Sequence, residues 1–248
     1  MIEKIKTRYW DMAAVTYDSL LAEMDAWRRE KLAEPKLVCF CDANGLAHGW
    51  NDEELAAAYQ KAVVCADGGV MLKLAKFSGG ELPGRCIGPI LFERAMEYGV
   101  SRGWKHYFYG TNEETLAALK AKVESRFRGV QIVGTWAPEY ADDPQLPPLT
   151  SSSGVDFLWV AIGSPKQEKW CARHLSELKC SAVLAVGAAF DFHAGTQKRA
   201  PAWVDKLGVC WIWRMLTGGS RVLKRDLWCV PRAAWILISE WVRMKWGV

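Results

Sequence analysis

Polar side chains follow several apolar runs of the chain, at points where buried strands would end. A carboxylate in such a position can take a proton from a hydroxyl group, and an arginine or a lysine can hold a phosphate. The polar residues at or near these positions are Asp42, Asn44, Asp67, Arg85, Asp191, Lys198 and Arg199. Ligands of open α/β sheets bind just beyond the carboxyl ends of the strands. The pattern therefore predicts a site for an anionic ligand at that edge of a sheet.

The stretch at residues 155–170, VDFLWVAIGSPKQEKW, is the best defined of these strand ends. An apolar run leads into Gly163, Ser164 and Pro165, and a polar segment that begins with Lys166 and Gln167 follows. We expect Ser164 to cap the following helix, Pro165 to occupy its first position, and the backbone N–H groups there to attract phosphate. A strand-to-helix turn without a ligand explains the same residues equally well.

A second strand end carries the turn Asp67-Gly68-Gly69, after a predicted strand at residues 63–66. Two consecutive glycines allow unusual backbone angles and let a ligand approach the main chain closely. The alternative is that Asp67 merely caps the helix that begins near Val70.

A third strand end, after residues 36–41, carries Asp42 and Asn44. Both side chains are suited to a ligand site, but hydrogen bonds to their own local backbone are the simpler explanation. A loop at residues 78–88, rich in glycine and proline, is long enough to move over a site and carries Arg85.

Two further strand ends are polar. The predicted strand at residues 104–109 opens into Gly110 and Thr111. The predicted strand at residues 182–186 leads to the densest polar patch of the chain, residues 187–203, which includes Asp191, His193, Lys198 and Arg199. The two basic residues of this patch could bind an anionic group or close the domain.

The elements that must position these residues alternate between strands and helices. Strands are predicted at residues 36–41, 63–66, 104–109, 130–133, 155–161 and 182–186, and helices at residues 1–34, 52–60, 70–77, 89–102, 112–128 and 166–178. This alternation predicts an α/β fold with a Rossmann-like, doubly wound and mainly parallel sheet. Neither GxGxxG nor GxxxxGK[ST] is present, so a dinucleotide site or a P-loop is not indicated.

Composition separates the tail from the rest of the 248 residues. Residues 198–248 hold ten Lys or Arg against three Asp or Glu, and seven of the fourteen tryptophans. We expect a main domain at residues 1–203 and a helical, basic, Trp-rich appendage at 204–248. An interfacial membrane helix and a helix packed on the body fit the appendage about equally, and a single-stranded nucleic acid would also favour such a surface.

The cysteines and acidic residues do not indicate a metal. The eight cysteines lie mostly inside apolar runs and form no CxxC pair, which favours reduced thiols in the cytosol. Asp142-Asp143 resembles a metal-binding pair, but it lies in a proline-rich loop away from any strand end. We therefore expect no metal site.

Four motifs occur in one order along the chain. They are Asp67-Gly68-Gly69, Arg85 with Gly88, the GSPKQE string at residues 163–168, and Phe190-Asp191 with Gly195 and Lys198-Arg199-Ala200-Pro201. In this order they resemble the WecG/TagA/CpsF family of bacterial glycosyltransferases, and the resemblance spans roughly residues 36–225. The chain departs from the family pattern at Asp42-Ala43-Asn44 and at Pro89, which stands where the family has an aspartate.

The resemblance implies an inverting, metal-independent transferase. Such an enzyme moves a hexose or N-acetylhexosamine from a UDP-sugar to a polyprenyl-pyrophosphate-linked sugar in cell-surface polysaccharide synthesis. It works at the inner face of the cytoplasmic membrane, with the UDP-sugar as a substrate and no cofactor. A non-catalytic subunit that binds a nucleotide-sugar or a lipid phosphate is the alternative. The expected partners are the UDP-sugar, the lipid-linked acceptor and an anionic membrane surface, without nucleic acid, and the oligomeric state stays open.

The resemblance also assigns roles to residues. Asp67 is expected as the general base, with Gln167 beside it in the catalytic pocket. The expected substrate-binding residues are Asp42, Asn44, Gly68, Gly69, Arg85, Gly110, Gly163, Ser164, Lys166, Asp191, Lys198 and Arg199. Arg214, Arg221 and Arg225 are expected to bind the lipid pyrophosphate and the membrane.

Overall fold

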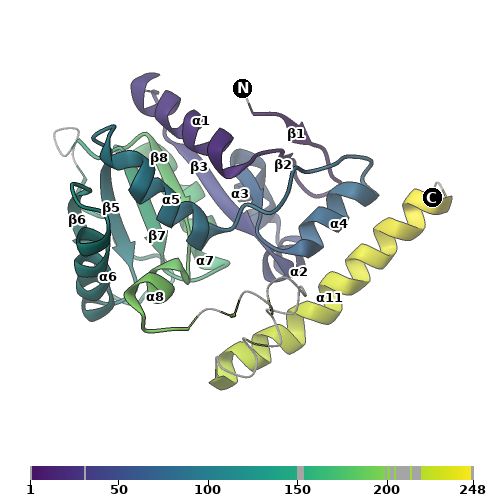
Figure 1. The fold of residues 1–248 in the computed structure, drawn as a ribbon. Coiled ribbons are helices and arrows are strands. Elements are labelled where there is room, and N and C mark those ends of the chain that lie inside the picture. Colours follow the sequence, from purple (N-terminus) through teal and green to yellow (C-terminus); the bar gives the residue numbers. More distant parts are fainter. Residues whose placement is uncertain are drawn as a thin grey trace.

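A six-stranded parallel sheet forms the centre of the molecule (Figure 1). The structure, a computed structural model, describes residues 2–30, 32–149, 154–198, 200, 201, 204, 213 and 219–246. In spatial order the strands are β4 (Val63–Ala66), β3 (Lys36–Cys41), β8 (Ala182–Ala185), β7 (Phe157–Ala161), β5 (Lys105–Gly110) and β6 (Gln131–Trp136). All six predicted strands are present. Five of them are mostly buried on both faces, while the edge strand β6 alternates between exposed and half-buried residues.

Helices cover both faces of the sheet. One face packs against α1 (Tyr17–Glu30), α5 (Gly88–Val100), α6 (Glu113–Arg126) and α8 (Ala189–Ala194). The other packs against α2 (Ala43–Gly49), α3 (Glu53–Lys61), α4 (Gly69–Phe77), α7 (Lys166–His174) and α11 (Gly219–Trp246). On β3, Val38 and Phe40 enter the first layer while Leu37, Cys39 and Cys41 enter the second, as the alternation of a strand requires. The predicted Rossmann-like α/β fold is confirmed.

The chain leaves neighbouring strands toward opposite faces at the middle of the sheet. After β3 it enters the layer of α2 and α3, and after β8 it enters the layer of α8. Such a change of side is a topological switch point, and ligands of doubly wound sheets bind there. The β3/β8 boundary is therefore where a site is expected.

The N-terminal segment differs from the helix predicted for residues 1–34. A short antiparallel pair, β1 (Lys4–Ile5) and β2 (Met12–Ala13), precedes α1. Met12 and Ala13 are buried against β4, so tertiary packing overrides the helical spacing.

Two short helices and the length of a third were not predicted. Helix α2 occupies the segment read as a loop after β3, and α8 lies in the polar patch after β8. Helix α11 runs for 28 residues without a break, through Pro231. The predicted helix at residues 166–178 ends as α7 at His174 and continues as a 3-10 turn, Leu175–Glu177.

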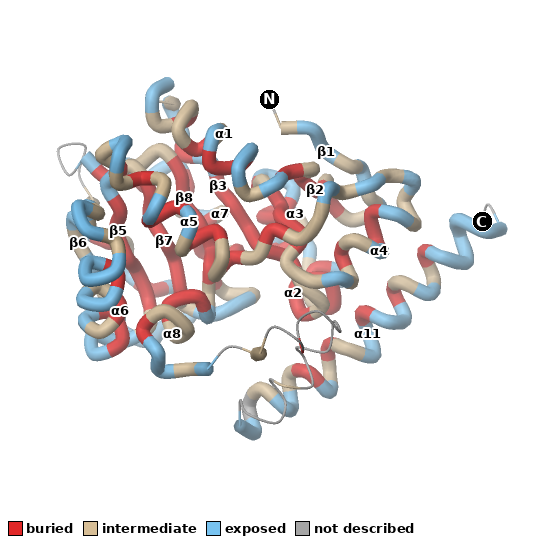
Figure 2. Tube along the Cα trace, in the orientation of Figure 1, coloured by how far each residue is buried: buried red, intermediate tan, exposed pale blue. Residues whose placement is uncertain are grey.

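Helix α11 packs on the body along one side and is exposed along the other, as the alternating burial along it in Figure 2 shows. Cys229, Ala233 and Ile236 form its buried stripe, and the helix lies against α2 and α4. On its outer side Trp235 is 56% exposed and Ile238 is 60% exposed. The interpretation of the tail as a helix packed on the body is thus confirmed for α11, while a membrane role of its outer side and the domain boundary at residues 203 and 204 stay predictions. The seven described cysteines are free thiols.

Candidate active site

The turns that follow β3 and β4 lie against each other at the carboxyl edge of the sheet. The backbone N–H of Asp67 donates to the Cys41 carbonyl at 2.9 Å. A Cβ atom added to Gly68 would lie 3.5 Å from both Cα and Cβ of Asp42. Parallel pairing of β3 with β4 therefore places the two predicted acidic strand ends side by side.

Asp42 is the N-cap of α2. Its Oδ1 atom accepts from the backbone N–H groups of Asn44 at 2.9 Å and Gly45 at 3.1 Å. The simpler explanation of Asp42, local backbone bonding, is confirmed, and this cap accounts for the unpredicted helix. Asn44 is only 4% exposed, and among the described residues no hydrogen-bond donor reaches its Oδ1 atom.

Asp67 is half-buried and is not the N-cap residue of α4. The N-cap is Gly68, with φ −105° and ψ 154° and no side-chain cap. The expectation of unusual backbone angles at the two glycines is thus wrong for Gly68, which is simply extended. A Cβ atom at Gly69 would meet nothing within 4 Å, so the second glycine leaves open space beside the Asp67 turn.

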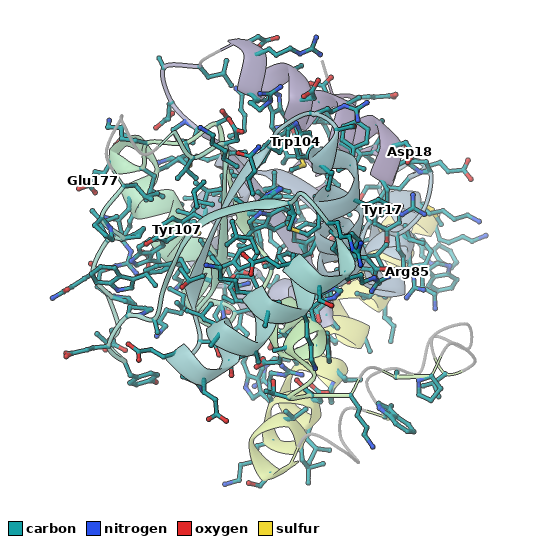
Figure 3. All side chains as sticks on the ribbon, turned by 60° about the vertical axis from the view of Figure 1, so that its left-hand side comes forward. Tyr17, Asp18, Arg85, Trp104, Tyr107 and Glu177 are labelled. Atoms are coloured by element: carbon teal, nitrogen blue, oxygen red, sulfur yellow. The ribbon has the colours of Figure 1, made fainter. Side chains whose placement is uncertain are left out.

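The loop that carries Arg85 is fixed beside Asp67. The backbone N–H of Cys86 donates to the Ala66 carbonyl at 2.9 Å, and that of Ile87 donates to the Tyr17 hydroxyl at 3.0 Å. Burial raises the pKa of Tyr17 to about 12, and the negative charge of Asp67 adds to the rise. Figure 3 shows Tyr17 and Arg85 on the same side of the molecule. Arg85, Asp67 and Tyr17 therefore belong to one neighbourhood.

The GSPKQE segment forms the turn between β7 and α7. Gly163 has φ +92°, a backbone angle that glycine adopts without strain. A Cβ atom there would meet nothing within 4 Å, so the backbone angle and not close packing accounts for the glycine. The expectation that Ser164 caps α7 is wrong: Pro165 is the N-cap, and no side chain caps this end. Lys166 points to the loop after β6, where its Nζ donates to the Ala141 carbonyl at 2.9 Å.

Gln167 and Glu168 turn into the protein rather than toward solvent. Gln167 is 3% exposed and Glu168 is 1% exposed. The Gln167 Nε2 atom donates to Glu168 Oε1 at 3.0 Å and to the Ala185 carbonyl at the end of β8 at 3.2 Å. A Cβ atom on Gly187 would lie 3.3 Å from that nitrogen. Gln167 therefore joins the α7 turn to the end of β8.

The sequence interpretation missed Glu168. Burial raises the pKa of this carboxyl to about 7, and the nearby charge of Asp42 acts in the same direction. Perturbed, buried carboxyls of this kind concentrate at functional sites. Helical spacing is the sequence signal for the burial of Glu168. Residues 167 and 168 lie on the same helix face as Trp170 and Cys171, which are fully buried.

The remaining predicted substrate residues lie at other strand ends of the same edge. Gly110, with φ +124°, brings β5 against β7, since a Cβ there would lie 2.3 Å from the Ala161 carbonyl oxygen. Its role in the structure is thus close packing. Asp191 lies in the first turn of α8, where burial raises its pKa and Thr196 Oγ1 donates to its Oδ1 at 3.3 Å. Lys198 is exposed at the end of this segment.

Only some of the predicted basic residues of the tail lie in the part of the chain that the structure describes. Arg199 and Arg214 lie outside the described residues, as does the side chain of Arg221 on α11. Arg225 is paired with the buried Asp226, whose Oδ1 lies 2.8 Å from Arg225 Nε.

Within the described residues, no helix is long and apolar enough to cross a bilayer. No group of three or more His, Cys, Asp and Glu side chains in the described part of the chain could share a metal ion.

The contacts link one series of residues across the carboxyl edge, from the Arg85 loop past Asp67, Asp42 and Glu168 to Gln167 and Gly187. Such an edge combines a carboxylate that can accept a proton, a cationic side chain, and the backbone N–H groups at the start of α7. Such groups suit a group-transfer reaction in which a hydroxyl attacks and an anionic group leaves.

Known proteins resemble this chain over most of its length. The sequence model described as "Glycosyl transferase WecG/TagA/CpsF family" matches residues 7–247. An N-acetylglucosaminyldiphosphoundecaprenol N-acetyl-beta-D-mannosaminyltransferase of Bacillus subtilis (strain 168) is 24% identical over 178 residues, which are 71% of this chain and 68% of that protein. Proteins of the same name from Bacillus spizizenii and Staphylococcus aureus (strain NCTC 8325) are 25% and 24% identical. Those matches cover 64% and 66% of this chain, and 62% and 64% of the relatives.

The family match covers nearly the whole chain and includes the four motifs described above. The chain therefore belongs to the WecG/TagA/CpsF family of glycosyl transferases.

Proposed function

We propose that this chain transfers a hexose or an N-acetylhexosamine from a UDP-sugar to a polyprenyl-pyrophosphate-linked sugar, with inversion and without a metal ion. The names of the relatives support an N-acetylmannosaminyl group as the first donor to test and a GlcNAc-diphosphate lipid as the first acceptor. The observation that carries the proposal concerns one described residue from each of the four motifs. Far apart in sequence, Asp67, Arg85, Gln167 and Asp191 lie on segments at the carboxyl edge of one parallel sheet.

Asp67 is the general base in this mechanism. Inverting transfer requires one group to take the proton of the acceptor hydroxyl as its oxygen attacks the anomeric carbon. Asp67 stands at the end of β4, one residue before the N-cap of α4, with its backbone N–H held by the Cys41 carbonyl. The open space beside Gly69 gives the acceptor room next to this carboxylate.

The leaving UDP carries away the electron pair of the broken glycosidic bond and must be stabilised. Backbone N–H groups at the start of α7 and the guanidinium of Arg85 are suited to this, because both favour a developing negative charge. Lys198 and Arg199 follow α8 and are further candidates. Lys166 is a weaker candidate, since its ammonium group is held by the Ala141 carbonyl and lies over the Tyr140 ring.

The outer side of α11 is proposed to lie on an anionic membrane surface, where the lipid-linked acceptor is found. Large apolar side chains there, among them Trp235 and Ile238, alternate with the exposed cations Lys224, Arg232 and Arg243. Amphipathic helices with this composition bind at the level of the lipid headgroups. Because α11 packs on α2 and α4, such binding would present the Asp67 edge near the membrane.

Replacing Asp67 with Asn tests the catalytic assignment. We expect transfer to be abolished while UDP binding, measured by calorimetry, and the unfolding transition are retained, since only the proton acceptor is lost. Asp18→Asn is the matched control, because this aspartate is 88% exposed on α1. Turnover of the Asp67 variant close to that of the wild type would contradict the base, and UDP binding without transfer by the wild type would favour a non-catalytic binding subunit.

Vesicle flotation tests the membrane surface. The double variant Trp235→Ser with Ile238→Ser should bind phosphatidylglycerol-containing vesicles several-fold more weakly, because each change removes exposed apolar area. Val133→Ser is the control, since Val133 is 44% exposed on β6 at the opposite end of the molecule (Figure 1). Unchanged flotation of the double variant, or tighter binding to oligonucleotides than to vesicles, would contradict this proposal.

A further inference from the structure

The side-chain amide of Gln167 is held in one orientation. Its nitrogen donates twice, to Glu168 Oε1 at 3.0 Å and to the Ala185 carbonyl at 3.2 Å. Both partners are acceptors, so the opposite orientation would point the amide oxygen at two oxygens. The geometry therefore assigns the nitrogen to the protein and the oxygen to the other side.

The amide oxygen of Gln167 is an acceptor in need of a donor. It is buried, and among the described residues it has no hydrogen-bond partner. Leaving a buried polar atom without a partner is costly, so each such atom in a native structure calls for an explanation, and a donor supplied by a ligand is one. Gly187 borders this oxygen, since a Cβ atom there would lie 3.4 Å from it. The oxygen therefore lies at the β3/β8 switch point.

We propose that Glu168 is a positioning residue that orients the Gln167 amide, so that Gln167 Oε1 accepts a hydrogen bond from a sugar hydroxyl or an N-acetylamino N–H of a substrate. This assignment rests on the proposed function for the identity of the ligand. It gives Glu168 a role without contact to the reacting atoms, and it makes the subsite selective for ligand groups that donate.

The charge of Glu168 controls this orientation. As a carboxylate it only accepts, and it holds the Gln167 nitrogen, whereas the neutral acid can donate to the Gln167 oxygen and compete with the ligand. Hydrogen bonds from the side chains of Gln167 and Ser164 favour the charged form of Glu168, and the titratable groups that act on it among the described residues are acidic or neutral. These groups are Asp42, Cys39, Cys41, Tyr59 and Cys171.

Two replacements of Glu168 test the proposal. Glu168→Met removes the acceptor at similar volume and should lower kcat/KM about tenfold, the effect of one hydrogen bond. Its thermal midpoint should be equal or higher, because an apolar side chain replaces a buried carboxyl. Glu168→Gln keeps an oxygen that can accept from Gln167 and should restore most of the loss. Glu177→Gln, at an exposed position after α7, is the control.

A pH profile separates positioning from a structural role. The wild-type kcat/KM should rise through an ionisation near the pKa of Glu168, about 7, and this limb should be missing in Glu168→Gln. Full activity of Glu168→Met, or the same limb in Glu168→Gln, would overturn the proposal while the proposed function stands.

Binding measurements keep the test independent of turnover. UDP-N-acetylmannosamine and a short-chain GlcNAc-diphosphate lipid are titrated into wild type and Glu168→Met by calorimetry. Weaker binding of at least one of them to the variant supports the positioning role, and equal binding of both overturns it. If the wild type binds these ligands but transfers nothing, the proposed function fails while this comparison still decides the role of Glu168.

Discussion

Glu168 should make the stability of the folded chain depend on pH in a way that Glu168→Gln removes. The pKa of its carboxyl rises from 4.5, the ordinary value, to about 7 in the folded protein, because burial disfavours the charged form. Between these values the unfolded chain has released its proton while the folded chain retains it. The folded state therefore loses stability as pH rises through this window, and none of the loss is recovered above it.

The size of the effect follows from the shift. A difference of about 2.5 pKa units at about 1.36 kcal/mol per unit corresponds to roughly 3 kcal/mol. Glu168→Gln has nearly the same shape and no titratable group. The free energy of unfolding of the variant, relative to the wild type, should therefore increase by roughly 3 kcal/mol between about pH 4.5 and about pH 8.

Urea unfolding followed by circular dichroism measures this difference at a series of pH values. Other groups with shifted pKa values, such as Asp191 and His106, contribute equally to both chains and cancel in the comparison. Glu139→Gln should give a curve parallel to the wild type, because this side chain is exposed in the loop after β6. A constant difference between Glu168→Gln and the wild type across the series would show that the carboxyl titrates as it does in water, and would refute the reasoning.

Three substitutions extend the predictions to the turns of the same edge. Gly110→Ala should destabilise the fold by about 2–4 kcal/mol in urea unfolding. Residue 110 has a positive φ, and the added Cβ would lie 2.3 Å from the Ala161 carbonyl oxygen. A change below about 1 kcal/mol would contradict the packing role. Gly69→Ala should change stability by less than about 1 kcal/mol but lower kcat/KM, since the added methyl meets only the open space beside Asp67; unchanged kinetics would mean that no substrate approaches there. Lys166→Met should lower kcat/KM less than about threefold, because the ammonium group is engaged by Ala141, and a hundredfold loss would return Lys166 to the phosphate site.

Most of the sheet was predictable because every strand except β6 is buried on both faces along most of its length. Runs such as residues 157–161 are apolar without interruption, and their carboxyl ends are followed directly by the polar motifs. The convergence of Asp42, Asp67 and the GSPKQE turn on one edge then follows from parallel pairing alone.

The parts that were not predicted depend on contacts that a single segment does not encode. Helix α2, ANGLAHG, contains two glycines and no clear apolar period, and it forms because Asp42 caps it and Tyr59 packs on its Gly45 side. Ser164 reads as a cap, yet the helix begins one residue later. The burial of Glu168 required knowing that the first turn of α7 faces the sheet, which its polar sequence conceals.

Helix α11 is tied to the opposite end of the chain. The Tyr9 hydroxyl donates to Glu240 Oε1 at 3.0 Å, and Arg8 lies 3.8 Å from the same atom. Tyr9 precedes β2, which packs beside β4, the strand that ends at Asp67. In hydrogen–deuterium exchange, amides of the first thirteen residues and of α11 should therefore open together as one cooperative unit. Anything that stabilises α11, including a bound lipid surface, would then slow exchange in the strand that carries the proposed base.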